Sequence, residues 1–185
     1  MRVFPRVLVY FGIFCLIFAG FLYWQRTTPT RLKFDTEKIE SSLSTSSTNV
    51  EPRALIIADL GIESDIYPAS IKNAKWEATS KGVSYLSSTP VPGEIGNSVI
   101  YGHNWKSILG NLVKARPGQT IKILYSDGSR KEFEIKYTQV VTPDQTQILD
   151  QTGDNRITLY TCTGFLDSKR FVVTATLSVD PDAAF

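Results

Sequence analysis

The feature that most constrains this chain is an uncharged run near its N-terminus, from Val7 to Trp24 (VLVYFGIFCLIFAGFLYW). As a helix with a rise of ~1.5 Å per residue, the run spans roughly 27 Å, close to the hydrocarbon thickness of a bilayer. It ends on the aromatic pair Tyr23-Trp24, which suits a membrane interface better than a cleaved signal peptide. A buried core helix is disfavoured, because the run has no polar face to show to water. We expect an uncleaved membrane anchor, with a cleaved signal peptide as the alternative.

Basic residues flank this run on both sides, so the positive-inside rule does not orient it: Arg2, Arg6, Arg26, Arg31 and Lys33. Because few residues precede the run, an N-terminus-in orientation would leave the rest of the chain outside the cell, and we expect this arrangement. Of the 20 Lys and Arg residues, 15 remain after position 34 against 18 acidic residues, a net charge of −3. This remainder has no basic stripe or motif for nucleic acid, so we expect no nucleic-acid partner.

The composition divides the chain into three parts. Residues 1–24 form a cytoplasmic tip and the anchor. Residues 25–50 include the run SSLSTSST, which is too poor in apolar groups to offset the entropy of ordering it, and we expect a Ser/Thr-rich stalk. Residues 51–185 are numerous enough for one domain with its own core.

The domain over 51–185 has an all-β pattern. The clearest local signal is the hairpin turn Ser126-Asp127-Gly128-Ser129, in which glycine accepts a positive φ. Segments rich in β-branched and aromatic residues predict strands at 54–57, 98–101, 120–125, 131–137, 156–161 and 171–177. Many short strands in one domain indicate a barrel or a sandwich. There is no internal repeat, phosphate-binding loop or paired-cysteine metal spacing.

Cys162 is the only cysteine of the domain, because Cys15 lies in the expected anchor, where a thiol needs no role. No disulfide can form within the domain, although an external location favours disulfides. Cys162 is either a small buried apolar residue or a nucleophile. The single histidine, His103, and Arg170 favour the second interpretation, because a thiol, an imidazole and a guanidinium can together cleave a peptide through a thioester. Taken singly, His103 and Arg170 would be ordinary surface residues.

The strand pattern brings these groups together. Gly102 permits a sharp turn that would present His103 at the rim of the domain. Cys162 ends one expected strand and Arg170 opens the next, so an antiparallel return through residues 163–169 places both at one end of the sheet. We therefore expect the sulfur, the imidazole and the guanidinium to meet at a single cleft that solvent can reach.

Three sequence blocks resemble the sortases, in order along the chain: PGEIGNSVIYGH (92–103), TLYTC (158–162) and SKRFVV (168–173). The resemblance implies a closed β-barrel of about eight strands with short helices, preceded by the transmembrane helix. It also implies a cysteine transpeptidase in which Cys162 is the nucleophile, His103 the acid and base, and Arg170 the group that binds substrate and stabilises the oxyanion. Thr161 matches a position that lines the site. The pair Asn104-Trp105 indicates no particular subclass.

The resemblance also implies partners and a location. The substrate would be a secreted protein with a C-terminal Leu-Pro-x-Thr-Gly-like sorting signal, and the acceptor an amine of a cell-wall peptide or a pilin lysine. The enzyme would be held in the cell membrane by a single N-terminal anchor, with its catalytic domain outside. Residues 142–154 stand where the family reads its substrate. Some relatives bind calcium near there, but no carboxylate cluster is clear enough to indicate such a site. We expect no cofactor or metal, with a bound calcium ion left open as the alternative.

Two other interpretations remain. The first is a cysteine acyl-transfer enzyme of another kind, such as a different peptidoglycan transpeptidase or a papain-like protease, although neither a His-Gly-Cys cluster nor a Cys-Gly-x-Cys-Trp block is present. The second is a membrane-tethered β-domain that only binds an extracellular partner, with Cys162 buried and Arg170 solvated. The rate at which a thiol reagent modifies Cys162 would distinguish a structural cysteine from a catalytic one.

Overall fold

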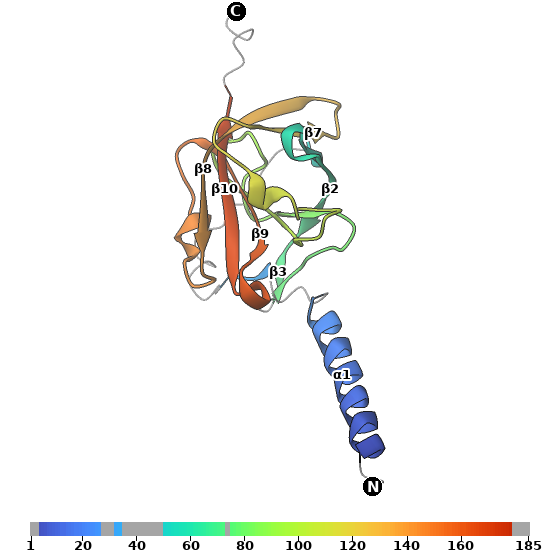
Figure 1. Cartoon of the computed structure of the whole chain (residues 1–185). Helices are drawn as coiled ribbons and strands as arrows, with labels where there is room; N and C mark the ends of the chain where they lie inside the picture. The colour runs from blue at the N-terminus through green and yellow to red at the C-terminus, as the bar shows by residue number, and fades with distance from the viewer. Residues whose placement is uncertain (1–3, 27–31, 35–49, 73–74, 179–185) are drawn as a thin grey trace, which may run out of the picture.

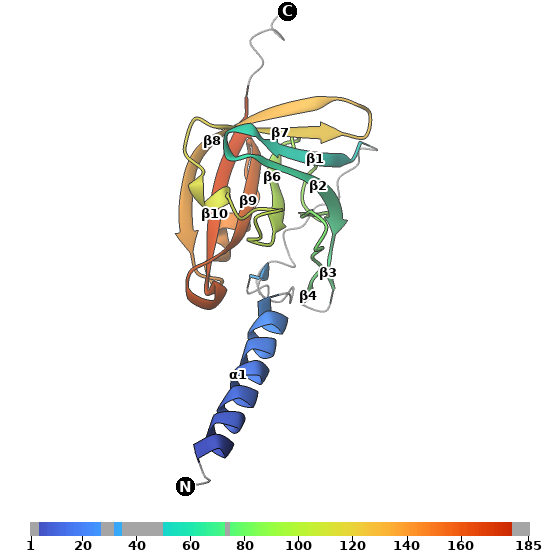
Figure 2. The ribbon, with the colours of Figure 1, turned by 45° about the vertical axis from the view of Figure 1, so that its right-hand side comes forward.

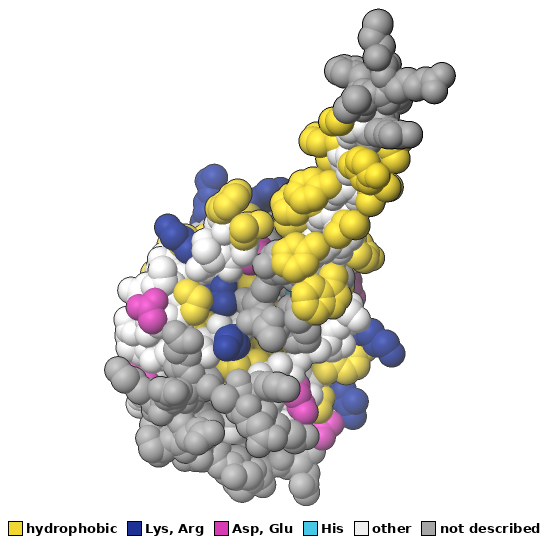
Figure 3. Space-filling view, turned by 90° about the horizontal axis from the view of Figure 1, so that it is seen from below, with side chains coloured by type: hydrophobic (Ala, Val, Ile, Leu, Met, Phe, Trp, Pro, Cys, Tyr) yellow, Lys and Arg dark blue, Asp and Glu magenta, His cyan; other side chains and the backbone are white. Residues whose placement is uncertain are grey.

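The computed structural model describes residues 4–26, 32–34, 50–72 and 75–178. The first element, α1 (Phe4–Arg26), projects from one end of a β-barrel (Figure 1). Its stretch Val7–Trp24 has a mean hydropathy of 2.2 and none of it is buried, so by length and composition it can cross a membrane. Seen from below, the apolar side chains of α1 stand clear of the barrel (Figure 3).

Eight of the described strands close into a barrel in the order β1-β2-β5-β6-β9-β10-β8-β7, which confirms the predicted closed β-barrel. Their bounds are β1 (Pro52–Ile57), β2 (Ile62–Ala69), β5 (Val83–Leu86), β6 (Gly96–Gly102), β7 (Thr120–Tyr125), β8 (Arg130–Val141), β9 (Asn155–Thr163) and β10 (Lys169–Leu177). A small separate ribbon pairs β3 (Ile71–Lys72) with β4 (Lys75–Trp76). The connections carry short 3₁₀ helices: η3 (Ala58–Leu60), η4 (Leu112–Lys114), η5 (Thr146–Leu149) and η6 (Phe165–Asp167).

Each strand expected from the sequence is present, and the turn at Gly128 joins β7 to β8 as predicted. Gly128 has a φ of 83°, and its N–H donates to the Tyr125 carbonyl at 3.1 Å. Two barrel strands were missed. In β2, Pro68 and acidic residues hide an alternation of buried and exposed positions, and β5 is a short strand with every residue buried.

The side chains of the central strands alternate between two apolar clusters. Ile100, Leu159 and Val173 belong to a cluster that draws on all the barrel strands and fills the interior. Their neighbours Tyr101, Tyr160 and Val172 belong to a second cluster, together with Cys162. Because successive side chains on a strand point to opposite faces, this second cluster lies on the outer face of β6, β9 and β10.

The two views of the ribbon show at which end of the barrel the connection between β9 and β10 lies. In Figures 1 and 2 the connection between β9 and β10, which carries η6, lies at the end from which α1 projects. Cys162 and Arg170 flank this connection. The candidate residues therefore lie at the end of the barrel from which α1 projects.

Candidate active site

The strand register brings the three candidate groups to one end of β6, β9 and β10. Arg170 on β10 is the Cα partner of Cys162 on β9. On the other side of β9, Thr161 pairs in parallel with Gly102, so His103 and Cys162 both lie one residue beyond that pair. Strand alternation gives His103, Cys162 and Arg170 the same outer face. The register thus places the three residues side by side at one end of adjacent strands.

The backbone before His103 is fixed by close packing around Gly102. A Cβ atom on Gly102 would lie 3.1 Å from a methyl group of Ile108 and 3.2 Å from one of Leu109, so these side chains would have to shift slightly to admit a larger residue. The Leu109 N–H donates to the His103 carbonyl at 3.1 Å. The hydroxyl of Thr161 donates to the Gly102 carbonyl at 2.8 Å.

Thr161 lies differently from the other candidates. It is fully buried, and alternation along β9 turns its side chain to the face opposite Cys162. Its hydroxyl thus supports the strand that carries His103, and its side chain does not line the face on which Cys162 lies.

The imidazole of His103 is covered. Only 5% of the residue is exposed, and its ring stacks on Trp105 with centroids 4.5 Å apart and an interplanar angle of 10°. Burial lowers the pKa of His103 from its usual 6.5, and the negative charge of Asp167 opposes this shift. Asp167 itself accepts a hydrogen bond from the Asn104 amide at 3.0 Å. Burial therefore favours the neutral form of His103 at neutral pH.

Arg170 is buried, with 3% of the residue exposed. Its Nη1 donates to the carbonyls of Asp167 and Lys169, both at 2.9 Å, and its Nη2 donates to the Lys33 carbonyl at 2.9 Å. Its Nε is buried and has no hydrogen-bond partner among the described residues. Arg170, the cross-strand partner of Cys162, thus carries one buried N–H that finds no acceptor among the residues that the structure describes.

The carbonyl of Asp167 reaches Arg170 from an unusual backbone. Leu166 and Asp167 have φ values of 51° and 59°, the left-handed region that non-glycine residues rarely adopt. Such residues cost of order 1 kcal/mol each and persist where surrounding contacts hold them. Here the two hydrogen bonds from Arg170 Nη1 and the bond from Asn104 to Asp167 provide those contacts.

The expected access of solvent to the cleft is absent. Cys162 is only 3% exposed and belongs to the outer cluster, whose members include Leu32 and Phe34. These two residues come from the range expected to form the polar stalk, most of which, 27–31 and 35–49, lies outside the described residues. The sequence carried a signal for this contact, because Leu32 and Phe34 are apolar residues among polar neighbours.

The connection expected to read the substrate, residues 142–154, is held by Asn97, a residue of β6 that the sequence did not single out. The Asn97 amide donates to the carbonyls of Ile148 at 3.0 Å and Asp150 at 3.1 Å, and its oxygen accepts from the Thr158 hydroxyl at 2.7 Å. Leu149 in this connection packs into the outer cluster with Cys162. A polar residue within a buried strand was the available clue.

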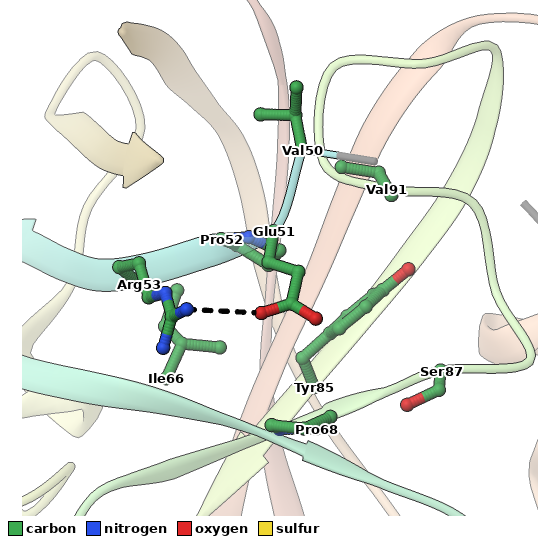
Figure 4. A pocket seen from close by; sticks show the side chains of 9 residues that line it. All are labelled: Val50, Glu51, Pro52, Arg53, Ile66, Pro68, Tyr85, Ser87 and Val91. Atoms are coloured by element: carbon green, nitrogen blue, oxygen red, sulfur yellow. Dashed lines mark ion pairs between the residues drawn. The ribbon is translucent and has the colours of Figure 1, made fainter. Parts of the chain in front are cut away.

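A cavity of about 160 Å³ lies between the start of β1 and the strands β2 and β5 (Figure 4), and none of the three candidate residues lines it. Its wall includes Tyr85 and Val91, and Arg53 pairs with Glu51 at 3.3 Å beside it. In the part of the chain that the structure describes, no three His, Cys, Asp or Glu side chains are grouped closely enough to hold a metal ion.

Comparison with known proteins identifies the family. The sortase domain family matches residues 55–178. Sortase A of Bacillus anthracis is 28% identical over 111 residues, which cover 58% of this chain and 52% of that protein. The chain therefore spans about half the length of this curated relative.

Solved structures agree with this match. Sortase C1 of Streptococcus agalactiae, in its complex with MTSET, superposes with a TM-score of 0.60 at 25% identity, covering 69% of each chain. The sortase D5 transpeptidase of Clostridium perfringens has a TM-score of 0.60 at 26% identity, covering 70% of this chain and 79% of that one. The barrel is thus a sortase barrel, and the chain belongs to the sortase family.

Proposed function

We propose that this protein is a membrane-anchored sortase transpeptidase. It cleaves a C-terminal sorting signal of the Leu-Pro-x-Thr-Gly type and transfers the acyl group to an amine of a cell-wall peptide or a pilin lysine. The supporting observation is the register in which Arg170 pairs with Cys162 while His103 follows the Gly102–Thr161 pair on the adjacent strand. Residues 1–24 are the tip and anchor, 25–50 the stalk, and 51–185 the catalytic domain outside the cell.

The first half-reaction forms a thioester. The Cys162 thiolate attacks the scissile carbonyl carbon, and the resulting oxyanion accepts a hydrogen bond from Arg170 Nε, which has no other acceptor in the described part of the chain. The C–N bond then breaks, and the leaving amine takes a proton from the His103 imidazolium. The acyl group remains on the sulfur of Cys162.

The second half-reaction releases the product. The nitrogen of an incoming amine attacks the thioester carbon, and the now neutral His103 takes the proton that the amine loses. The C–S bond breaks, which restores the thiolate, and a new amide joins the acyl group to the acceptor. If water attacks in place of the amine, the product is a carboxylic acid and the reaction is hydrolysis.

The reactive form needs a thiolate and an imidazolium at the same time. Because burial lowers the pKa of His103, the protonated ring is the scarce component at neutral pH, and the charge of Asp167 partly restores it. The rate should therefore follow a bell-shaped pH profile with two apparent pKa values that belong to the pair.

The test uses the full chain in detergent with a library of pentapeptide sorting motifs and a small amine, and detects the acyl-enzyme by intact-mass and peptide-mapping spectrometry. We expect an acyl adduct on Cys162 and transfer of the acyl group to the amine. Cys162→Ala should abolish both, whereas the matched control Cys15→Ala, which alters the other cysteine of the chain, should retain both. An adduct that maps to another residue would reject the assignment.

One observation favours a second candidate function, a β-domain that binds a partner without catalysis. Cys162 is 3% exposed, as expected for a structural cysteine. Under this alternative, none of the peptides forms an adduct, and Cys162 reacts slowly with alkylating reagents even when the segment that covers it is altered.

A further inference from the structure

The connection between β9 and β10 exposes two large apolar side chains, Phe165 and Leu166, which we call the apolar tip. Among the residues that the structure describes, Phe165 is the most exposed large apolar residue, at 85%, and Leu166 is 53% exposed. A single exposed apolar side chain is ordinary on a protein surface, but two adjacent ones on a short turn indicate a contact surface.

The backbone of this turn holds the apolar tip out from the barrel. Leu166 has a φ of 51°, in the left-handed region. The Asp167 N–H donates to the Gly164 carbonyl, and the Ser168 N–H donates to the Phe165 carbonyl, both at 3.2 Å. Turning the two side chains back onto the barrel would require breaking these hydrogen bonds. Their exposure is therefore a property of an ordered turn.

The apolar tip lies close to the end of α1 along the chain as well as in space. α1 ends at Arg26, and Leu32, six positions later, is buried against the barrel. Six residues span at most about 22 Å. Arg170 joins the next residue to the turn, since its Nη2 donates to the Lys33 carbonyl and its Nη1 to the Asp167 carbonyl, both at 2.9 Å. If α1 crosses a membrane, this short tether keeps the apolar tip near the bilayer surface.

Three exposed lysines lie near the apolar tip. Lys169 ends the turn, and Lys33 is held beside it through its carbonyl. Lys106 comes two positions after Asn104, whose amide donates to the half-buried Asp167 carboxylate at 3.0 Å. Seen from below, apolar side chains and Lys or Arg side chains share this end of the barrel around α1 (Figure 3). Apolar groups flanked by cations are the pattern that binds the surface of an anionic membrane.

We propose that the apolar tip inserts into the interface of an anionic bilayer, while Lys33, Lys106 and Lys169 contact the lipid headgroups. Segments of this kind bury their apolar side chains about 5–10 Å into the boundary between headgroups and acyl chains. This second contact fixes the orientation of the barrel, which α1 alone would only tether. The inference goes beyond the proposed function: it requires α1 to be an anchor, and it does not require catalysis.

The test places a fluorescent NBD reporter on the full-length protein in vesicles of phosphatidylcholine and phosphatidylglycerol. The background is Cys15→Ala with Cys162→Ala, so the reporter occupies the one introduced cysteine, Ser168→Cys, at an exposed position beside the apolar tip. Lipids with a nitroxide on the upper acyl chain should quench this reporter. The matched reporter is Ile95→Cys, which is 71% exposed in the parent and lies at the other end of β6 from His103. It should be quenched little.

The decisive variant removes the apolar tip. Phe165→Ser with Leu166→Ser should abolish most of the quenching at position 168, because the turn then has no apolar group to insert. Both side chains are exposed, so the circular dichroism should match that of the parent. Ile95→Ser, which removes an exposed apolar side chain far from the turn, should leave the quenching at 168 unchanged. In vesicles of phosphatidylcholine alone, the quenching should weaken, since the lysines lose their anionic partners.

Each of four results would overturn the proposal. Equal quenching at position 168 with and without the apolar tip would mean that the tether alone keeps the barrel near the bilayer. Quenching that does not depend on lipid charge would remove the role of the lysines. If the serine double variant with Cys162 restored lost peptide transfer in detergent while position 168 stayed quenched, the apolar tip would contact the peptide. A parent that does not float with the vesicles would reject the anchor and this inference together. The reporter proteins all lack Cys162, so failure here is separate from failure of the transpeptidase proposal.

Discussion

At the scale of single residues, Arg170 has a geometry that lysine cannot reproduce. Its planar guanidinium donates to three carbonyls and keeps Nε free of protein acceptors among the described residues. An ammonium is a compact charge with no fixed fork, so it cannot hold these carbonyls and also aim a donor at the oxyanion.

Arg170→Lys should therefore lower kcat/KM for the peptide-to-amine transfer by ~10²–10³, as expected when one oxyanion donor is lost. The measurement is steady-state kinetics, with the circular dichroism of the variant compared with the parent. Lys169→Arg is the matched control, since it exchanges a neighbouring exposed cation on the same strand. A Lys variant within about threefold of the parent would mean that positive charge alone suffices.

The buried imidazole of His103 makes stability depend on pH. Its folded-state pKa lies below the usual 6.5 because burial favours the neutral ring. Above about pH 6.5 the ring is neutral in both the folded and unfolded states, so its contribution to stability is constant. As the pH falls below that value, the unfolded state binds a proton that the folded state does not. The free energy of unfolding then decreases, by up to about 1.4 kcal/mol per pH unit.

His103→Gln should remove this contribution. The measurement is urea unfolding of both full-length proteins in detergent, followed by tryptophan fluorescence between about pH 7.5 and about pH 5. Carboxylates titrate in both proteins, so the difference between the two curves isolates the histidine. Parallel curves over this range would contradict the lowered pKa.

At the scale of elements, Asn97 links β6 to the connection 142–154 and to β9. Asn97→Ala leaves the Asp150 carbonyl without this donor, and leaves the Thr158 hydroxyl and the Ile148 carbonyl only the 3.3 Å hydrogen bond that joins them to each other. We expect a loss of about 2–3 kcal/mol in the free energy of unfolding, because buried polar groups lose their hydrogen bonds. The KM for the sorting peptide should rise more than kcat falls, since the connection that Asn97 holds is the expected substrate reader.

Urea unfolding and steady-state kinetics measure these two effects. Asn97→Asp is the informative control: its carboxylate keeps the acceptor for Thr158 and loses the donors to Ile148 and Asp150. It should therefore raise KM about as much as Asn97→Ala. Normal KM in both variants would show that the connection does not depend on this anchor.

Some features of these elements could be predicted from the sequence, and others could not. The hairpin at Gly128 was predictable because its turn chemistry and its strand patterns are local. The meeting of Cys162 and Arg170 was predictable because an antiparallel return fixes their register. The covering of Cys162 by Leu32 and Phe34 could not be predicted, because it depends on contacts between residues far apart in the sequence. Leu32, for example, lies 128 positions before Tyr160, whose hydroxyl donates to the Leu32 carbonyl. Composition alone made that region appear to be a polar stalk.

At the scale of the whole molecule, the apolar helix α1 projects from the end of the barrel that carries Cys162 and Arg170 (Figure 2). If α1 crosses a membrane, the site faces the bilayer surface, and Leu32 and Phe34, which share the outer cluster with Cys162, come shortly after the end of α1 at Arg26 in the sequence. A position near the surface suits a substrate that is itself held in the membrane while its C-terminal signal is processed.

The anchor should behave as an integral membrane segment. Two arginines at the centre of α1, Leu16→Arg and Ile17→Arg, each cost about 2.5–3.5 kcal/mol of insertion free energy, so the double variant should be released from membranes by alkaline carbonate while the parent is not. Their matched control is Leu16→Val with Ile17→Val, which preserves hydropathy.

On intact cells, external protease should digest the domain over 51–185 of the parent and spare a cytoplasmic marker. Full protection of that domain would reverse the proposed orientation, and with it the access of Cys162 to any substrate outside the cell.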